Sequence, residues 1–260
     1  MIKINARRIC VVTGGSGFLG ETIVKELTKE GYQVVSLDKT EPQYELGSAI
    51  YFQCDILNRN EVKELLGSYI LESDSLEVLI NNAAIDAKVD HSVKTVKSFA
   101  NYDLDSLQNE LGVAIQGSLT VIQECLPYFF KSSSTNKSII YIGSDLAVIA
   151  PDQRIYKDNA GKQTFLKPVS YSIVKHATLG LIKYLAVEFA QHGIRVNGVS
   201  PGPIMHEQPI FVKRNIEERV PLGRLATRDD AVSAIKFLAN QNSGYITGQN
   251  IQVDGGRTIW

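Results

Sequence analysis

The chain has few of the residues that mark secreted, metal-binding or nucleic-acid-binding proteins. Its 260 residues include 3 cysteines and 4 histidines, and the formal net charge is -1. The cysteines lie far apart within apolar stretches, so we expect buried free thiols and no disulfide framework. The histidines have no metal-ligand spacing, so we expect no metal site. A charge near zero also gives no reason to expect nucleic acid as a partner.

The sequence also lacks long apolar runs. None is long enough to span a bilayer, and the first eight residues lack the apolar core and cleavage site of a signal peptide. Hydrophobic residues make up 44% and charged residues 21% of the chain, which is typical of a soluble globular protein. We therefore expect a cytoplasmic protein with no membrane partner, folded as one α/β domain or two small ones.

A glycine-rich turn at 14–20 (GGSGFLG) is the first informative motif. A β-branched run at 8–13 precedes it, and a helical pattern follows as far as Gly31. Strand, glycine turn and helix form the context that a dinucleotide fingerprint requires. The glycines allow close backbone approach, and the helix N-terminus offers N–H groups to a pyrophosphate. An ordinary glycine-rich loop is the alternative, and the flanking strand and helix argue against it.

A second predicted strand, at 33–37, ends in Asp38. A carboxylate at this strand tip can accept hydrogen bonds from a ribose diol and would repel the additional phosphate of NADP. The glycine turn has no Arg or Lys to hold that phosphate, although Lys39 could serve it. We expect NAD as the cofactor, with NADP less favoured.

Further strands and helices alternate along the chain. We expect short strands at 50–52, 76–80 and 138–142, helices at about 58–71 and 104–130, and an irregular polar connection at 86–103. This alternation predicts a single-domain Rossmann-type α/β fold, a doubly wound parallel sheet with helices on both faces. Such a sheet binds its ligand at the carboxyl ends of the strands.

Polar residues follow three of these strands. Asp55 follows the third strand, where it could meet an adenine ring or cap the next helix. The amides of Asn81 and Asn82 follow the fourth strand and can join strand ends. Ser144 follows the fifth strand, where catalytic groups of this architecture collect, although simple turn chemistry would also explain it.

Tyr171 and Lys175 begin a run of apolar periodicity that extends to Ala190. Residues four apart share a helical face. A free tyrosine has a pKa of about 10, and an ammonium one turn away lowers that pKa by favouring the phenolate. The pair is a candidate acid/base on a rigid element. An amphipathic helix with an incidental Tyr and Lys is the alternative.

Six motifs in order resemble the short-chain dehydrogenase/reductase family. They are Thr13-Gly14-x-x-Gly17-x-x-Gly20, Asn81-Asn82-Ala83, Ser144, Tyr171-x-x-x-Lys175, Asn197-x-x-x-Pro201-Gly202, and a tail running from Pro221-Leu222-Gly223-Arg224 to Val253-Asp254-Gly255-Gly256. The resemblance covers nearly the whole chain, and it implies a single NAD-binding oxidoreductase domain over residues 1–260.

The resemblance implies a role for each matched residue. Tyr171 would be the acid/base, Ser144 would hydrogen-bond the substrate oxygen, and Lys175 would hold the nicotinamide ribose. The implied cofactor-binding residues are Gly14, Ser16, Gly17, Phe18, Leu19, Asp38, Asp55, Ile56, Asn82, Ala83, Ala84, Tyr171, Lys175, Pro201, Gly202 and Ile204.

The sequence departs from the family pattern in three places. The glycine spacing matches the extended branch, whose members often act on nucleotide sugars, whereas the chain length and C-terminal half match the shorter dehydrogenase branch. Ala114 stands where the family has an asparagine that completes a proton relay, and Asn109 is more than a turn away. The stretch between Ser144 and Tyr171 contains an insert at 151–168.

We expect the insert and the loop at 202–222 to cover the substrate mouth. Arg154, Lys157 and Lys162 could bind an anionic, hydroxyl-rich ligand. A solvated surface loop is the equal alternative. The insert resembles bacterial family members linked to flagellin modification and nonulosonic acid sugar biosynthesis.

The expected reaction is NAD-dependent hydride exchange between a secondary alcohol and a ketone. The expected substrate is an anionic sugar derivative, a sugar or nucleotide-linked sugar of surface-glycan biosynthesis. Two alternatives remain open. One is a sugar epimerase or dehydratase with tightly bound NAD, and the other is a non-catalytic dinucleotide-binding module.

Two predicted helices, at 104–130 and 171–190, carry more apolar residues than one sheet face needs. In the resembled family these helices form a dimer interface and tetramers are common, so we expect a homo-oligomer and specifically a homotetramer. The apolar residues concerned are Val113, Leu119, Ile122 and Leu126 on the first helix and Leu179, Ile182, Leu185 and Phe189 on the second.

Overall fold

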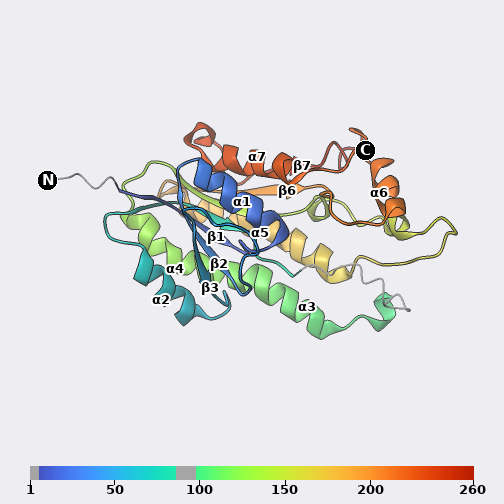
Figure 1. The fold of residues 1–260 in the computed structure, drawn as a ribbon, viewed down its shortest axis with the longest axis horizontal. Coiled ribbons are helices and arrows are strands. Elements are labelled where there is room, and N and C mark those ends of the chain that lie inside the picture. The colour runs from blue at the N-terminus through green and yellow to red at the C-terminus, as the bar shows by residue number, and fades with distance from the viewer. Residues whose placement is uncertain (1–5, 86–97) are drawn as a thin grey trace.

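The sheet holds seven parallel strands in the order β3-β2-β1-β4-β5-β6-β7 (Figure 1). It is seen in a computed structural model, which describes residues 6–85 and 98–260. The strands are β1 (Arg8–Thr13), β2 (Gln33–Asp38), β3 (Ile50–Gln53), β4 (Ser75–Asn81), β5 (Lys137–Ile142), β6 (Ile194–Pro201) and β7 (Asn250–Val253). The predicted doubly wound parallel sheet is therefore confirmed.

Helices cover both faces of the sheet, as Figure 1 shows. Buried side chains of α1 and α7 pack on one face, and those of α2, α4 and α5 pack on the other. The helices are α1 (Phe18–Lys29), α2 (Arg59–Tyr69), α3 (Leu104–Leu111), α4 (Ser118–Lys131), α5 (Val169–Ala190), α6 (Ile210–Glu217) and α7 (Arg228–Ala239). Parallel strands buried on both faces explain the continuous apolar runs in the sequence.

The direction of winding changes between β1 and β4, which are neighbours in the sheet. In an open α/β sheet, a crevice forms at the carboxyl ends of the strands at such a switch point, and ligands bind there. The glycine turn follows β1 and the amides of Asn81 and Asn82 end β4. The topology therefore brings two of the predicted motifs to one crevice.

The helix predicted at 104–130 is interrupted. A π-helical turn, Gly112–Gly117, separates α3 from α4. Such wide turns often occur at functional sites, and this one contains the buried Ala114. Residues 86–97, most of the predicted irregular connection, lie outside the described residues. The described end of that connection contains a short 3-10 turn, Phe99–Asn101.

The assignment of apolar residues to an oligomer interface is partly wrong. Most of them pack in or against the core: Ile122, Ile182, Leu185 and Phe189 are buried in it, and Val113, Leu126 and Leu179 are partly buried against it. Other apolar residues of the same helical segments are exposed instead: Leu104, Ile173, Tyr184 and Val187. The error arose because spacing alone does not say which apolar stripe of a helix faces the sheet.

All three cysteines are buried and free, as predicted. Burial raises the pKa of each thiol, that of Cys54 to about 12. Within the described part of the chain, no helix has the length and apolar character needed to cross a membrane.

Candidate active site

Backbone geometry explains the glycines of the turn after β1. Gly14 has φ 67°, and a Cβ there would lie 2.8 Å from the Ala83 Cα. A Cβ at Gly20 would lie 2.1 Å from the Gly14 carbonyl oxygen. Only glycine allows the turn to pack this closely against the end of β4 and the start of α1.

Asp38 lies at the tip of β2 and faces this turn. Its carboxylate accepts hydrogen bonds from the backbone N–H groups of Ser16 at 2.9 Å and Thr40 at 3.0 Å. The carboxylate is therefore fixed beside the glycine turn, where the predicted ribose contact requires it.

Lys39 pairs with Asp55, and the Nζ to Oδ2 distance is 2.8 Å. Burial opposes ionisation of Asp55, but the Lys39 hydrogen bond and the Leu57 N–H bring its pKa below the ordinary value. The pairing directs Lys39 toward the end of β3. This geometry weakens the argument that Lys39 serves a 2′-phosphate.

The alternative role of Asp55 as a helix cap is wrong. The cap of α2 is Asn58, whose side chain accepts a hydrogen bond from the Glu61 N–H. The Asp55 carboxylate accepts a hydrogen bond from the Leu57 N–H at 3.0 Å, within the turn before the helix. Ile56, the next predicted cofactor residue, is buried.

Asn82 joins the ends of β1 and β4, as the sequence predicted. Its Nδ2 donates to the carbonyl oxygens of Gly14 at 2.8 Å and Thr13 at 3.2 Å. In return, the Thr13 hydroxyl oxygen accepts from the N–H groups of Asn82 and Ala83, each at 3.1 Å. These bonds set Ala83 and Ala84 beside the glycine turn, where small residues leave room for a ligand.

Ser144, Tyr171 and Lys175 converge at the carboxyl end of β5. Ser144 is buried two residues beyond that strand, and α5 packs against the short turn that follows it, Asp145–Ala147. Lys175 is buried, and its Nζ donates to the Ile142 carbonyl oxygen at 3.0 Å. The same Nζ lies 5.7 Å from the centroid of the Tyr171 ring.

Two features of α5 favour a phenolate at Tyr171. The Lys175 ammonium, one turn away, stabilises negative charge on the ring oxygen. Tyr171 is the third residue of the helix, whose first turn contains no acidic residue. The positive end of the helix dipole therefore also favours an anion at this point.

Two residues that the sequence analysis missed support Ser144. The Ser144 hydroxyl donates to Asp145 Oδ1 at 2.9 Å, and Arg257 forms an ion pair with the other oxygen of that carboxylate. Arg257 is 112 residues away in the C-terminal tail. No sequence spacing links the two, so only the fold could identify them.

A third missed residue, Glu110, lies on α3 one turn before Ala114. Glu110 is buried, and its Oε1 accepts a hydrogen bond at 2.8 Å from the hydroxyl of Ser170, the residue before Tyr171. A carboxylate therefore links the central helix to the start of α5. It adjoins the turn where the resembled family has its asparagine.

The Pro201–Gly202 motif ends β6 and is tied to the C-terminal tail. Gly202 N–H donates to the Val253 carbonyl oxygen at 3.0 Å, and a Cβ at Gly202 would lie 2.9 Å from the Asp254 Cα. Asn197 links the strand to the tail through the Ile246 carbonyl oxygen, at 2.8 Å. Ile204, the last predicted cofactor residue, forms an isolated bridge with Ala226.

The loop at 202–222 reaches the glycine turn. The ring of His206 stacks on that of Phe18, with centroids 4.5 Å apart. The guanidinium of Arg228 lies 4.9 Å from the same Phe18 ring. The loop thus extends over the turn at which the predicted dinucleotide site begins.

Part of the insert at 151–168 packs against α6, although many of its residues are exposed, and its role over the substrate mouth stays a prediction. Ile155 is buried with Val212, Ile216, Val220 and Leu225 from α6 and the residues after it. The rings of Tyr156 and Phe165 lie edge to face, with centroids 5.0 Å apart. In Figure 1 the insert runs out from the start of α5 and lies beside α6.

Arg154 does not present an unpaired charge. It forms two hydrogen bonds to Asp152, which also binds Arg219 at 2.7 Å. The two arginines hold the pKa of Asp152 well below its usual range, against the opposing effect of burial. Lys157 and Lys162 are exposed on the hairpin of the insert.

Lys167, at the end of the insert, lies against Tyr171. Its Nζ is 3.8 Å from the centroid of the Tyr171 ring. The side-chain amide of Gln153 forms two hydrogen bonds with the Lys167 backbone. Gln153 Nε2 donates to the Lys167 carbonyl oxygen, and Gln153 Oε1 accepts from the Lys167 N–H, each at 2.9 Å. The insert therefore brings an ammonium to the candidate acid/base, and the sequence analysis overlooked it.

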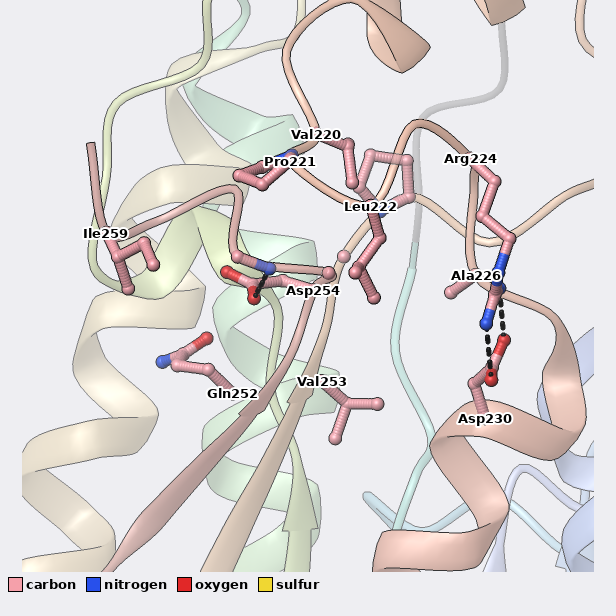
Figure 2. Close-up of a pocket in the computed structure, with 14 residues that line it drawn as sticks. Val220, Pro221, Leu222, Arg224, Ala226, Asp230, Gln252, Val253, Asp254 and Ile259 are labelled. Atoms are coloured by element: carbon pink, nitrogen blue, oxygen red, sulfur yellow. Dashed lines mark hydrogen bonds and ion pairs between the residues drawn. The ribbon is translucent and has the colours of Figure 1, made fainter.

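A hollow of about 430 Å³ lies next to this site (Figure 2). Tail residues such as Val253 and Ile259 form one wall, and Val220, Pro221 and Leu222 form the other. Its lining includes Gly202 but none of Ser144, Tyr171 or Lys175. We therefore place the reaction at the strand ends and treat the hollow as a neighbouring cavity.

The family model described as enoyl-(acyl carrier protein) reductase matches residues 16–258. The chain therefore belongs to this family of short-chain dehydrogenase/reductases. The match spans most of the glycine turn, the Ser144, Tyr171 and Lys175 cluster and the tail.

Relatives with a named activity or a solved structure match nearly the whole chain. It is 27% identical to the 3-oxoacyl-[acyl-carrier-protein] reductase FabG of Thermotoga maritima, over 97% of this chain and 98% of that protein. It resembles the short-chain dehydrogenase of Leptospira borgpetersenii, solved with bound NAD+, with a TM-score of 0.84, 29% identity and coverage of 97% and 93%. For the ligand-free aldohexose dehydrogenase of Thermoplasma acidophilum the TM-score is 0.80 and the identity 25%, with coverage of 98% and 95%.

The names of these relatives point to different substrates. Family membership therefore defines the fold and the class of enzyme, an oxidoreductase, and leaves the substrate open. None of the three names refers to flagellin or to nonulosonic acids, so that part of the sequence interpretation stays a prediction.

Proposed function

We propose that the protein is an NAD-dependent oxidoreductase that exchanges a hydride between a secondary alcohol and a ketone. The observation that carries the proposal is the convergence of Ser144, Tyr171 and Lys175 beside the glycine turn. Acid/base, hydrogen-bonding and cationic groups thus come together at the carboxyl end of β5. Family membership supports the same reaction class.

The residues of the crevice fit NAD. The glycine turn packs closely against the end of β4 and the start of α1, and the Ser16 hydroxyl is buried with no hydrogen-bond partner among the described residues. A pyrophosphate oxygen would satisfy that hydroxyl, and the Asp38 carboxylate suits a ribose diol. NAD bound here would supply the hydride acceptor. The bound NAD+ in the Leptospira relative supports this choice.

The groups of this chain would handle the proton. In alcohol oxidation, Tyr171 as phenolate takes the hydroxyl proton of the substrate while the C–H bond yields the hydride, and a ketone results. Lys175 stabilises the phenolate, and Ser144 hydrogen-bonds the substrate oxygen and holds it in line. In ketone reduction the same proton returns from Tyr171.

Lys167 supports an anionic substrate. Its ammonium lies closer to the Tyr171 ring than that of Lys175 does, at 3.8 Å against 5.7 Å from the centroid. A carboxylate or phosphate a few bonds from the reacting carbon would therefore lie near Lys167 and form a charge-assisted hydrogen bond. The aldohexose dehydrogenase likeness favours a sugar as the carrier of this group.

The test is a panel of sugars and nucleotide sugars assayed for NADH absorbance. Galacturonate and its methyl ester differ by one negative charge, so comparing them tests recognition of a carboxylate. Galactose 6-phosphate tests recognition of a phosphate in its place. We expect Lys167→Gln to raise the KM of a charged substrate and to leave that of the ester unchanged, with Lys162→Gln as the matched control.

Other outcomes of the panel favour other functions. NAD that stays bound through purification, with substrate conversion and no net NADH, would indicate the epimerase or dehydratase. Binding of NAD without any turnover would indicate a non-catalytic module. Equal KM values for Lys167→Gln and wild type with every charged substrate would remove the anionic part of the proposal.

A further inference from the structure

A buried ion pair lies directly behind Ser144. The side chains of Asp145 and Arg257 are 4% and 5% exposed, and Arg257 Nη1 contacts Asp145 Oδ2. At this depth, desolvation offsets most of the Coulomb attraction, so such a pair adds little stability over apolar residues of the same size. Stability alone therefore gives no reason for a charged pair at this position.

Hydrogen bonds connect the pair to Ser144. The contact of 2.9 Å between Ser144 Oγ and Asp145 Oδ1 needs a hydrogen, and an ionised carboxylate has none, so the serine is the donor. The Leu146 N–H donates to the same carboxylate oxygen at 2.8 Å and to Ser144 Oγ at 3.2 Å. The position of Oγ and the direction of its hydrogen are both set by this network.

The direction of that hydrogen matters for the reaction. To stabilise the oxygen of a ketone or a developing alkoxide, Ser144 must turn its hydrogen from Asp145 toward the substrate. A carboxylate without a counter-ion is the stronger acceptor and would retain the hydrogen. Arg257 offsets the charge of Asp145 and so lowers the free-energy cost of rotating the Ser144 hydroxyl toward the substrate.

We propose that Asp145 and Arg257 are positioning residues for Ser144. Asp145 holds the serine oxygen at the reacting point, and Arg257 keeps the carboxylate from retaining the serine hydrogen. The C-terminal tail thereby takes part in the reaction without touching the substrate. The inference rests on the proposed hydride-transfer function.

The decisive experiment is a double-mutant cycle between Arg257 and Ser144. Arg257→Met should lower kcat by about tenfold or more, which is within the coupling range of interacting residues. The Kd of NAD, measured by titration, should stay unchanged. In a Ser144→Ala background the same Arg257→Met change should have almost no further effect, because the group it acts through is gone. Arg257→Lys restores the charge and should recover most of kcat.

Arg224→Met is the matched control. Arg224 also forms an ion pair, with Asp230 at 2.7 and 3.0 Å (Figure 2), but among the described residues it forms no hydrogen bond with Ser144. Its effect on kcat should be small and should not depend on Ser144. Melting temperatures of all variants establish that kcat is compared on folded protein, and Arg257→Gln, which also removes the charge, replaces the Met variant if that variant does not fold.

Two results would overturn the inference. Equal fold-losses for Arg257→Met with serine or alanine at 144 would mean that the pair acts on the fold and not through the serine. A wild-type kcat in both Arg257 variants would mean that the pair has no role in the reaction. If wild type itself produces no NADH from any substrate, the proposed function fails and the inference falls with it.

Discussion

Individual side chains carry the chemistry of this protein, and their surroundings set their properties. Tyr171 has two ammonium groups near its ring, Lys175 at 5.7 Å and Lys167 at 3.8 Å from the centroid. Positive charge near a phenol oxygen favours its ionised form, which the proposed proton transfer requires.

Replacement of Tyr171 by Phe should abolish turnover and leave NAD binding nearly intact. Loss of an acid/base group typically costs on the order of 100- to 10,000-fold in rate. The phenyl ring keeps its packing, so the fold and the cofactor site should persist. Single-turnover rates and NAD titrations measure the two effects separately. Turnover close to wild type would contradict the assignment of Tyr171.

The discrimination between NAD and NADP should depend on Asp38. Its carboxylate is held beside the glycine turn by the Ser16 N–H, and Lys39 is paired with Asp55. Asp38→Ala should narrow the preference for NAD by about tenfold, or roughly 1.4 kcal/mol, because the repulsion of a 2′-phosphate is lost. Titration of the wild type and the variant with NAD and with NADP measures this difference in affinity. Tighter binding of NADP than of NAD by the wild type would show that Lys39, and not Asp38, decides the choice of cofactor.

Among the elements, the insert shows how a loop becomes part of a site. The buried Ile155 attaches it to α6, and Asp152 ties it to Arg219. Gln153 then fixes the main chain of Lys167 next to α5. The insert is therefore fastened to the helices beside it, and its place over the substrate mouth stays a prediction.

Acid should loosen this insert. The folded protein lowers the pKa of Asp152, so its contribution to stability is present above the ordinary carboxyl pKa near 4 and is lost as pH falls through the depressed value. Asp152→Asn should lower the melting temperature near pH 7, and the difference from wild type should shrink near pH 3.

Asp158→Asn is the control for this change. Asp158 accepts the N–H groups of Ala160 and Lys162 within the tip of the insert, away from Arg219. It should not reproduce the pH dependence of Asp152→Asn. A difference between wild type and Asp152→Asn that is constant with pH would show that the ion pairs do not fasten the insert.

At the scale of the whole molecule, large apolar side chains remain exposed on two helices. Leu104, Ile173, Tyr184 and Val187 are exposed on α3 and α5, and Val187 is 81% exposed. Contiguous apolar surface on a soluble protein commonly marks an interface. We expect these residues of α5 to lie in the interface of a homo-oligomer, and we propose a tetramer.

Val187→Asp should dissociate the oligomer or weaken it strongly. A charge buried at an interface without a partner is costly, whereas at an exposed position it is tolerated. Sedimentation at micromolar concentration compares wild type with the variant, and Lys183→Asp on the exposed side of the same helix helps to map the surface. A monomeric wild type would contradict the prediction.

The sequence by itself determined the architecture and supplied the candidate site residues. Local signals were sufficient where one segment carries them: buried strands alternate with amphipathic helices, glycines mark the turn after β1, and Tyr171 and Lys175 are four residues apart. Strands β6 and β7 were not predicted as strands. The motif Asn197-x-x-x-Pro201-Gly202 interrupts any regular apolar pattern in β6, and β7 is only four residues long.

Only the tertiary structure decided which distant side chains meet. Asp145 and Arg257 are 112 residues apart and pair behind Ser144, and Glu110 reaches Ser170 from another helix. Lys167 reaches Tyr171 because Gln153 fixes its backbone, and most of the expected interface residues pack in or against the core instead. Such contacts depend on how helices rotate and loops pack against the sheet. Local spacing holds no information on either, since the burial that fixes them comes from segments far along the chain.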